Sequence, residues 1–352
     1  MKELLARPLV VCVGPGGVGK TTVAAALAVR AARDGQKALV LTIDPAKRLA
    51  DALGLSGLDD EVHEVPVGEG LLGAAMLDTK ASYDSLMARI ASPAQREAIL
   101  ENRVYQAFSR TLARSHAYVA SERLYDVAQS GRWDLIVLDT PPTRSALDIL
   151  DAPGRLVSFL DEKVLEVFLE GRGAGGTFAA LANLGGAAAL RLFGRLAGEG
   201  IAEELSGFLR LLADHRHGFH QRAEAVRAML GDDATAFVLV ADPSATSLDD
   251  AWHLAGALRE RGVALQRVVF NRAYTAEPLG RGPLLPPGDG LPAALAELRS
   301  RLVSKQRAKL DRARGFAGTV TSGAATTLLA ERPEGPRTIE ELAGLFDERV
   351  DD

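Results

Sequence analysis

The most constraining feature of this 352-residue chain is a glycine-rich stretch near its N-terminus. Residues 14–21 (GPGGVGKT) fit the pattern G-x-x-x-x-G-K-[ST], in which a loop cradles phosphate groups. The apolar run Leu9–Val13 precedes the loop and an alanine-rich helical pattern follows it, so the loop joins a strand to a helix, as the pattern requires. A turn that merely packs tightly would need neither the lysine nor the threonine. The sequence therefore predicts a phosphate-binding loop.

Each residue type in this loop has a physical role in binding a nucleoside triphosphate. Glycines let backbone N–H groups point at the phosphates, and the helix N-terminus adds a partial positive charge. Lys20 supplies a full positive charge, and the hydroxyl of Thr21 is placed to bind Mg²⁺. The expected binding residues are Gly14, Gly16, Gly17, Val18, Gly19, Lys20, Thr21 and Thr22.

Short apolar runs alternate with helical patterns along much of the chain, which predicts an α/β fold with a doubly wound, mostly parallel sheet. Ligands of such sheets bind at the carboxyl ends of the strands. Asp44, Asp139 and Asn271 each follow an apolar run, so they are expected at the same edge as the loop. The runs that predict buried strands include Lys37–Ile43, Trp133–Asp139, Thr235–Ala241 and Arg267–Phe270.

The predicted organisation is one domain over residues 1–352 with helical subdomain insertions at 81–129 and 151–230. Between residues 156 and 230, apolar residues recur at helical spacing. This pattern fits an exposed apolar groove and ordinary core packing against the sheet equally well.

Composition narrows the classes of partner. The chain carries 41 Lys and Arg against 46 Asp and Glu, a net charge of −5, so no global basic field favours nucleic acid. No run approaches the roughly 18 apolar residues of a membrane span, and the N-terminal apolar run is too short for a signal peptide. We therefore expect a soluble, cytoplasmic protein without an integral membrane segment. The single cysteine, Cys12, excludes an internal disulfide and suits a small buried apolar residue.

Three stretches, residues 14–22, 44–53 and 139–150, together resemble the deviant-Walker-A ATPases. This family includes the arsenite-efflux pump ATPase and the targeting factor for tail-anchored membrane proteins. The order and spacing persist to Asn271 and Pro333–Gly335, so the resemblance covers essentially the whole chain. It implies a P-loop fold of the SIMIBI-like type, in which ATP bound at a dimer interface closes two protomers and rearranges a helical subdomain. The implied partners are a second copy or a paralogue, and a hydrophobic protein client.

The resemblance also implies roles for individual residues. Asp44 matches the residue that orients or deprotonates the attacking water, although it also suits a helix N-cap. Asp139 matches the acid near Mg²⁺, and Asn271 matches the residue that contacts adenine. Phosphoryl transfer depends mainly on positioning and charge neutralisation, so these roles are chemically coherent. The expected site thus has Asp44 and Lys20 as catalytic residues, Thr21 and Asp139 as metal ligands, and ATP and Mg²⁺ as cofactors.

Two departures from the family pattern bear on function. The second position of the loop, usually a lysine that reaches the partner's phosphates, is Pro15, which carries no charge. Either Lys47, Arg48 or Arg144 supplies the missing charge, or the chain pairs with a paralogue that keeps the lysine. The cysteines by which family members bind zinc or arsenite are also absent. The single cysteine of this chain cannot replace the several thiolates that such a site needs.

Three functions follow from these observations. The first is a Mg²⁺-dependent ATPase whose nucleotide-driven dimer closure controls a helical client-binding subdomain. The second is a low-activity regulatory nucleotide-binding subunit of a heteromeric pair, which Pro15 favours and the intact Lys20, Thr21, Asp44 and Asp139 oppose. The third, a metabolic kinase or amidoligase on the same fold, fits the segments that follow the second strand and Asp139 less well.

Overall fold

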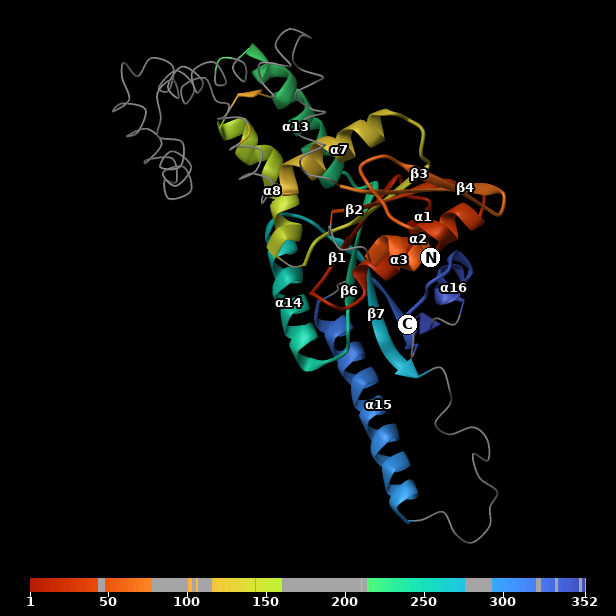
Figure 1. Ribbon diagram of the computed structural model, residues 1–352. Coiled ribbons are helices and arrows are strands. Elements are labelled where there is room, and N and C mark those ends of the chain that lie inside the picture. Colours follow the sequence, from red (N-terminus) through yellow and green to blue (C-terminus); the bar gives the residue numbers. More distant parts are fainter. Residues whose placement is uncertain are drawn as a thin grey trace. The chain divides into compact units, whose positions relative to one another are not determined.

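The computed structural model describes residues 1–43, 48–77, 101–102, 106, 116–142, 144–159, 210, 214–275, 293–320, 324–332, 335–347 and 350–351. The chain divides into two compact units (Figure 1). The first comprises Met1–Met76, Arg132–Leu147 and Asp233–Asp352, and the second comprises Leu77–Gly131 and Asp148–Asp232. The predicted insertions at 81–129 and 151–230 stay predictions, since large parts of them lie outside the described residues.

The first unit is built on a sheet whose described strands are β1 (Leu9–Val13), β2 (Lys37–Thr42), β3 (His63–Val67), β4 (Gly70–Met76), β5 (Leu135–Asp139), β6 (Thr235–Ala241), β7 (Leu265–Thr275), β8 (Ala325–Glu331) and β9 (Val350–Asp351). Their order is β3-β4-β2-β5-β1-β6-β7-β8-β9. Neighbours pair in parallel except at the two edges, where β3 with β4 and β8 with β9 are antiparallel. The predicted α/β fold with a mostly parallel sheet is confirmed.

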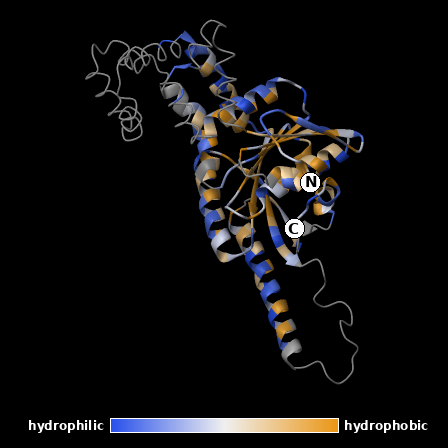
Figure 2. Cartoon of the chain, viewed as in Figure 1, coloured by the Kyte–Doolittle hydropathy of each residue, from blue (hydrophilic) through white to orange (hydrophobic). Residues whose placement is uncertain are grey.

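The central strands are apolar along their whole length because the sheet is buried on both faces. Every residue of β1 is buried. Successive side chains of a strand point to opposite faces, so Val10 and Cys12 join the core cluster that includes α2 (Lys20–Arg33), while Leu9, Val11 and Val13 are buried outside that cluster. Figure 2 shows the hydrophobic residues gathered in these strands. A strand without polar alternation is typical of such parallel sheets.

Helices of the first unit pack on this sheet. α2 contacts β2 and β5, and its small residues, such as Ala24 and Ala28, are fully buried. α14 (Ala245–Glu260) contacts β6, and α15 (Ala293–Val320) contacts β7 and α14 (Figure 1). The rings of Phe270 and Phe316 join β7 to α15 edge to face at 5.9 Å. The shorter helices are α1 (Lys2–Leu5), α3 (Arg48–Leu53), α16 (Ile339–Ala343) and the 3₁₀ turn η1 (Gly344–Phe346).

The second unit contains α7 (His116–Gln129) and α13 (Arg216–Gly231), which pack together. Glu122 of α7 is buried and forms an ion pair with Arg222 of α13 at 2.9 Å. The hydroxyl of Tyr118 donates to the same carboxylate, and the Arg222 guanidinium lies 5.4 Å from the centre of the Phe219 ring. α8 (Arg144–Phe159) begins in the first unit and continues into the second.

One predicted boundary is wrong. β7 does not end before Asn271 but continues to Thr275. Its pairing with β8 shifts register between Phe270 and Tyr274, and Arg272 has a φ of 55°. Asn271 is a poor strand former and the apolar run ends at Phe270, so an apolar pattern cannot reveal a strand that continues past an irregularity of this kind.

Among the residues that the structure describes, no helix combines the length and the apolar character needed to cross a membrane.

Candidate functional site

The glycine-rich loop connects β1 to α2, as predicted, and three of its glycines, among them Gly14 with a φ of 156°, have backbone angles that favour glycine. Gly17 has a φ of 76° and Gly19 a φ of 90°. A Cβ at Gly19 would lie 2.3 Å from Nδ2 of Asn271. The backbone conformation at this position favours glycine, and any larger residue would also have to displace the Asn271 side chain.

The Lys20 side chain is held inside the loop. Lys20 is 7% exposed, and its Nζ donates a 2.8 Å hydrogen bond to the backbone oxygen of Pro15. A hydrogen bond from an ammonium to an anionic oxygen is stronger than one to a neutral carbonyl. A phosphate oxygen would therefore be a stronger acceptor for Lys20 than the Pro15 carbonyl is. Among the residues that the structure describes, no side chain caps α2, whose N-cap is Gly19, so the first-turn N–H groups are available to a ligand at this site.

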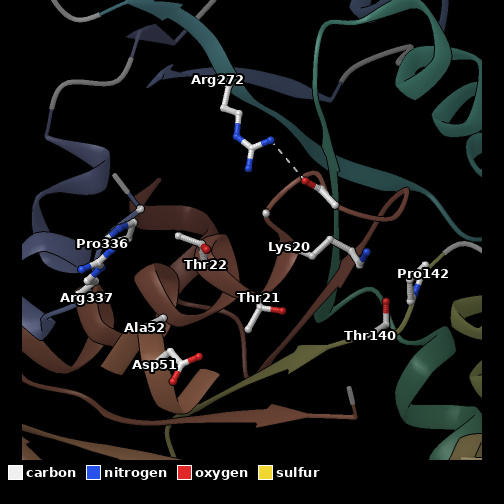
Figure 3. A pocket seen from close by; sticks show the side chains of 13 residues that line it. Lys20, Thr21, Thr22, Asp51, Ala52, Thr140, Pro142, Arg272, Pro336 and Arg337 are labelled. Atoms are coloured by element: carbon white, nitrogen blue, oxygen red, sulfur yellow. Dashed lines mark hydrogen bonds between the residues drawn. The ribbon is translucent and has the colours of Figure 1, made fainter. Parts of the chain in front are cut away.

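A cavity of about 360 Å³ lies over the loop, at the carboxyl edge of the sheet (Figure 3). Among the described residues, the charged side chains that line it are Lys20, Arg272, Arg337 and Asp51, three cations and one anion. This balance favours an anionic ligand. The lining residues are Gly17, Gly19, Lys20, Thr21, Thr22, Asp51, Ala52, Thr140, Pro142, Arg272, Gly335, Pro336 and Arg337.

Asp139 ends β5 beside the loop. It is fully buried, and the hydroxyl of Thr42 donates to its Oδ2 at 2.8 Å. In the parallel ladder Asp139 stands opposite Cys12, the last but one residue before the loop. Thr140, the next residue, donates its hydroxyl to the Cys12 oxygen at 2.7 Å and lines the cavity. β5 therefore places a carboxylate close to the loop, as the sequence predicts.

Burial makes the Cys12 thiol chemically inert. The residue is fully buried, which strongly raises the pKa of the thiol, and the nearby charge of Asp139 raises it further. The thiol stays protonated at neutral pH, so it is neither a nucleophile nor a metal ligand.

Asn271 contacts the loop directly. Its Nδ2 donates to the Val18 oxygen at 2.9 Å, and its Oδ1 accepts from the backbone N–H of Arg272 at 3.0 Å. The structure thus brings Asn271 to the loop from a distant part of the sequence. Its contact with adenine stays a prediction.

The structure does not describe the side chains of four other predicted residues. Asp44 and Lys47 lie outside the described residues. Arg48 begins α3 and Arg144 begins α8, but their side chains are not described. The source of the charge missing at Pro15 therefore stays a prediction.

Several lining side chains were not among the predicted site residues. Arg272 follows Asn271, Asp51 falls within the 44–53 segment, and Pro336 and Arg337 follow the Pro333–Gly335 segment. Only their nearness in sequence to these motifs could have marked them as cavity residues, because the residue types themselves are common on protein surfaces.

The donor set near the loop suits Mg²⁺. The Thr21 hydroxyl and the Asp139 carboxylate are hard oxygen donors, which this ion prefers. Among the described residues, no group of three or more His, Cys, Asp or Glu is arranged to hold a metal ion. Mg²⁺ commonly takes one or two protein oxygens together with water and phosphate oxygens, so the two residues fit the ion.

A glycine-rich loop between β1 and α2, with a buried lysine and a neighbouring strand that ends in an acid, defines a P-loop nucleotide-binding protein. Comparison with known proteins identifies the family. The family model described as anion-transporting ATPase matches residues 8–280. The chain therefore belongs to the anion-transporting ATPase family, a family of ATP-hydrolysing enzymes.

Individual relatives agree with this assignment. A protein of Aquifex aeolicus, whose name refers to arsenical pump-driving ATPases, is 25% identical over 283 residues, which are 75% of this chain and 80% of that protein. The arsenical pump-driving ATPase of Acidiphilium multivorum is 27% identical over 75% of this chain and 39% of its own length. The ATPase ARSA1 of Chlamydomonas reinhardtii is 27% identical over 75% of this chain and 34% of its own length. The chain thus spans well under half of the two longer relatives.

Proposed function

We propose that this chain binds Mg²⁺ and ATP in the cavity over residues 14–22 and hydrolyses the nucleotide. The observation that carries the proposal is the buried Lys20, which contacts a neutral carbonyl inside a glycine loop and lines a cavity rich in cationic side chains. Membership of an ATPase family supports the same reaction.

In this proposal each residue has a distinct task. The loop N–H groups and Lys20 bind the phosphates and neutralise the charge that develops during transfer. Thr21 and Asp139 hold the metal, directly or through its water, and Mg²⁺ supplies further charge neutralisation when bound. Asp44, by its resemblance to the family residue, orients or deprotonates the attacking water, and Asn271 contacts the base.

ATP turnover by the full chain, with Mg²⁺ or with a chelator, tests this function. We expect turnover that requires the metal and falls by about 100-fold or more in Lys20→Ala, since one electrostatic group of this kind contributes 10²–10³ to the rate. Lys305→Ala on α15 is the matched control, because Lys305 is an exposed lysine outside the cavity. Equal turnover in wild type and Lys20→Ala would count against the proposal.

The finer part of the proposal concerns partners. We infer that nucleotide closes a dimer and thereby controls a helical region that binds a hydrophobic protein client; the resemblance to the family and the described helices of the second unit, α7 and α13, support this. ATP turnover and nucleotide affinity measured with a hydrophobic-helix peptide test the client part. If the peptide changes neither quantity, that part fails.

A regulatory subunit with little hydrolysis of its own is the second candidate, and Pro15 favours it. A proline carries no charge and cannot reach a partner's phosphates. Single-turnover hydrolysis by the isolated chain separates the two functions, because a regulatory subunit would bind ATP without hydrolysing it.

A further inference from the structure

Arg272 has an unusual backbone conformation that its neighbours hold in place. Among the described non-glycine residues it is the one with positive φ, at 55°. Its N–H donates to Oδ1 of Asn271, and its carbonyl accepts from Nζ of Lys309 at 3.3 Å. Lys309 is in turn fixed by an ion pair with Glu331 at 3.0 Å. A strained residue that several contacts maintain at the rim of a site indicates a role in that site.

This conformation directs the Arg272 side chain over the glycine loop. Its Nη1 donates to the Gly17 oxygen at 3.4 Å, and the residue lines the cavity although it is exposed. Figure 3 shows Arg272 and Pro336 toward one end of the cavity, and Lys20 and Thr140 toward the other. Arg272 therefore lies near Asn271, away from the part of the loop where Lys20 binds phosphate.

We propose that Arg272 is a nucleotide-positioning residue that binds the nucleoside end of ATP rather than its phosphates. The inference rests on the proposed function, because it takes Lys20 to mark the phosphate end. A guanidinium plane stacks on an aromatic base and still has several N–H donors for the ribose or base after its bond to Gly17. Pro336 also lines the cavity.

This placement has a kinetic signature that differs from that of Lys20. The nucleoside is unchanged by hydrolysis, so contacts to it stabilise ground state and transition state equally and alter KM without altering kcat. ATP and ADP must also depend on Arg272 to the same extent. A guanidinium that replaced the charge missing at Pro15 would instead favour ATP over ADP and would lower kcat when removed.

The test uses the full chain and measures Kd by calorimetry for ATP, ADP and tripolyphosphate, each with Mg²⁺, together with ATP turnover. In Arg272→Gln we expect Kd for ATP and ADP to rise equally, by about tenfold, the effect of losing a charged hydrogen bond. Tripolyphosphate affinity and kcat stay within about twofold of wild type. Arg272→Lys recovers only part of the loss, because the planar fork is missing.

Two further variants keep the result interpretable. Arg307→Gln removes an exposed arginine from α15 outside the cavity and leaves every constant unchanged. Arg272→Asn, whose side chain tolerates positive φ, repeats the nucleotide loss while raising the melting temperature of the free protein by about 2 °C.

Two results would overturn the inference while leaving the proposed function intact: unchanged affinity in Arg272→Gln, or tripolyphosphate binding weakened as much as ATP binding. Wild-type protein that fails to bind ATP at all would overturn the proposed function as well.

Discussion

Asp139 brings a fully buried carboxylate to the carboxyl end of a central strand, and the proposed function gives it a role in holding Mg²⁺. A buried carboxylate is costly, and the Thr42 hydroxyl that donates to it is a neutral partner. We predict that Asp139→Asn lowers turnover by about 100-fold and raises the Mg²⁺ concentration needed for half-maximal turnover. Steady-state rates over a Mg²⁺ titration measure both.

The same variant should remain folded. Asparagine keeps the shape of the side chain, and its Oδ1 can still accept from Thr42, so the free energy of unfolding falls by no more than about 1 kcal/mol. Urea unfolding measures it. A large loss of stability together with unchanged Mg²⁺ dependence would mean that Asp139 is structural.

At the residue scale, the sequence predicts what depends on local pattern. Lys20 and Gly19 are fixed by the spacing of one motif, and both lie where that motif requires. Arg272 could not be predicted, because its place in the cavity depends on a positive φ and on a bond to Gly17, 255 residues away in sequence. The position of Asn271 at this edge was predicted from the apolar run before it, whereas its role came from the resemblance.

At the element scale, Gly70 allows β4 to start against the end of α2. A Cβ there would lie 2.2 Å from the Ala32 oxygen and 2.5 Å from the Gln36 oxygen, both backbone atoms that cannot easily move aside. We predict that Gly70→Ala lowers the free energy of unfolding by about 2–3 kcal/mol. Gly256 in α14 has no atom within 4 Å of the same added methyl, so Gly256→Ala should raise it by about 1 kcal/mol.

Denaturant titration of both variants checks this pair. The two substitutions add the same methyl group. If both raised, or both lowered, the free energy of unfolding, the close contact of Gly70 with backbone oxygens would not be the cause of the effect at Gly70.

The ion pair between α7 and α13 gives a prediction for the second unit. Glu122 is 4% exposed as a residue, and removal of Arg222 would leave its carboxylate without this counter-charge. We predict that Arg222→Met destabilises the protein by about 3 kcal/mol, and that adding Glu122→Gln restores most of the loss. Urea unfolding of the two single variants and the double variant measures the coupling. Additive losses would contradict it.

Strand positions were predictable wherever burial imposes an apolar run. The expected strand Thr235–Ala241 coincides with β6, and the one expected at Trp133–Asp139 starts two residues before β5. The continuation of β7 past Asn271 was not predictable, because the apolar run ends before Asn271 and a register shift in strand pairing leaves no mark on the sequence pattern. Strand pairing at the edges also depends on contacts that no local pattern reports.

At the scale of the whole molecule, the proposed mechanism requires two protomers, and mass measurement tests this directly. We predict that light scattering gives about the mass of one 37.2 kDa chain without nucleotide and about twice that mass with Mg²⁺ and a slowly hydrolysed ATP analogue. The physical reason is linkage, because a ligand that binds the closed dimer better than the monomer shifts the equilibrium by its differential affinity. Lys20→Ala, with weakened phosphate binding, should stay at the single-chain mass.

Pro15 removes the usual cross-dimer charge. A mass that stays at one chain with nucleotide, and doubles only when a paralogue with a loop lysine is added, would therefore favour the heteromeric form. Turnover at full rate by a chain that never dimerises would show that hydrolysis here proceeds within one protomer, and the closure mechanism would then be wrong.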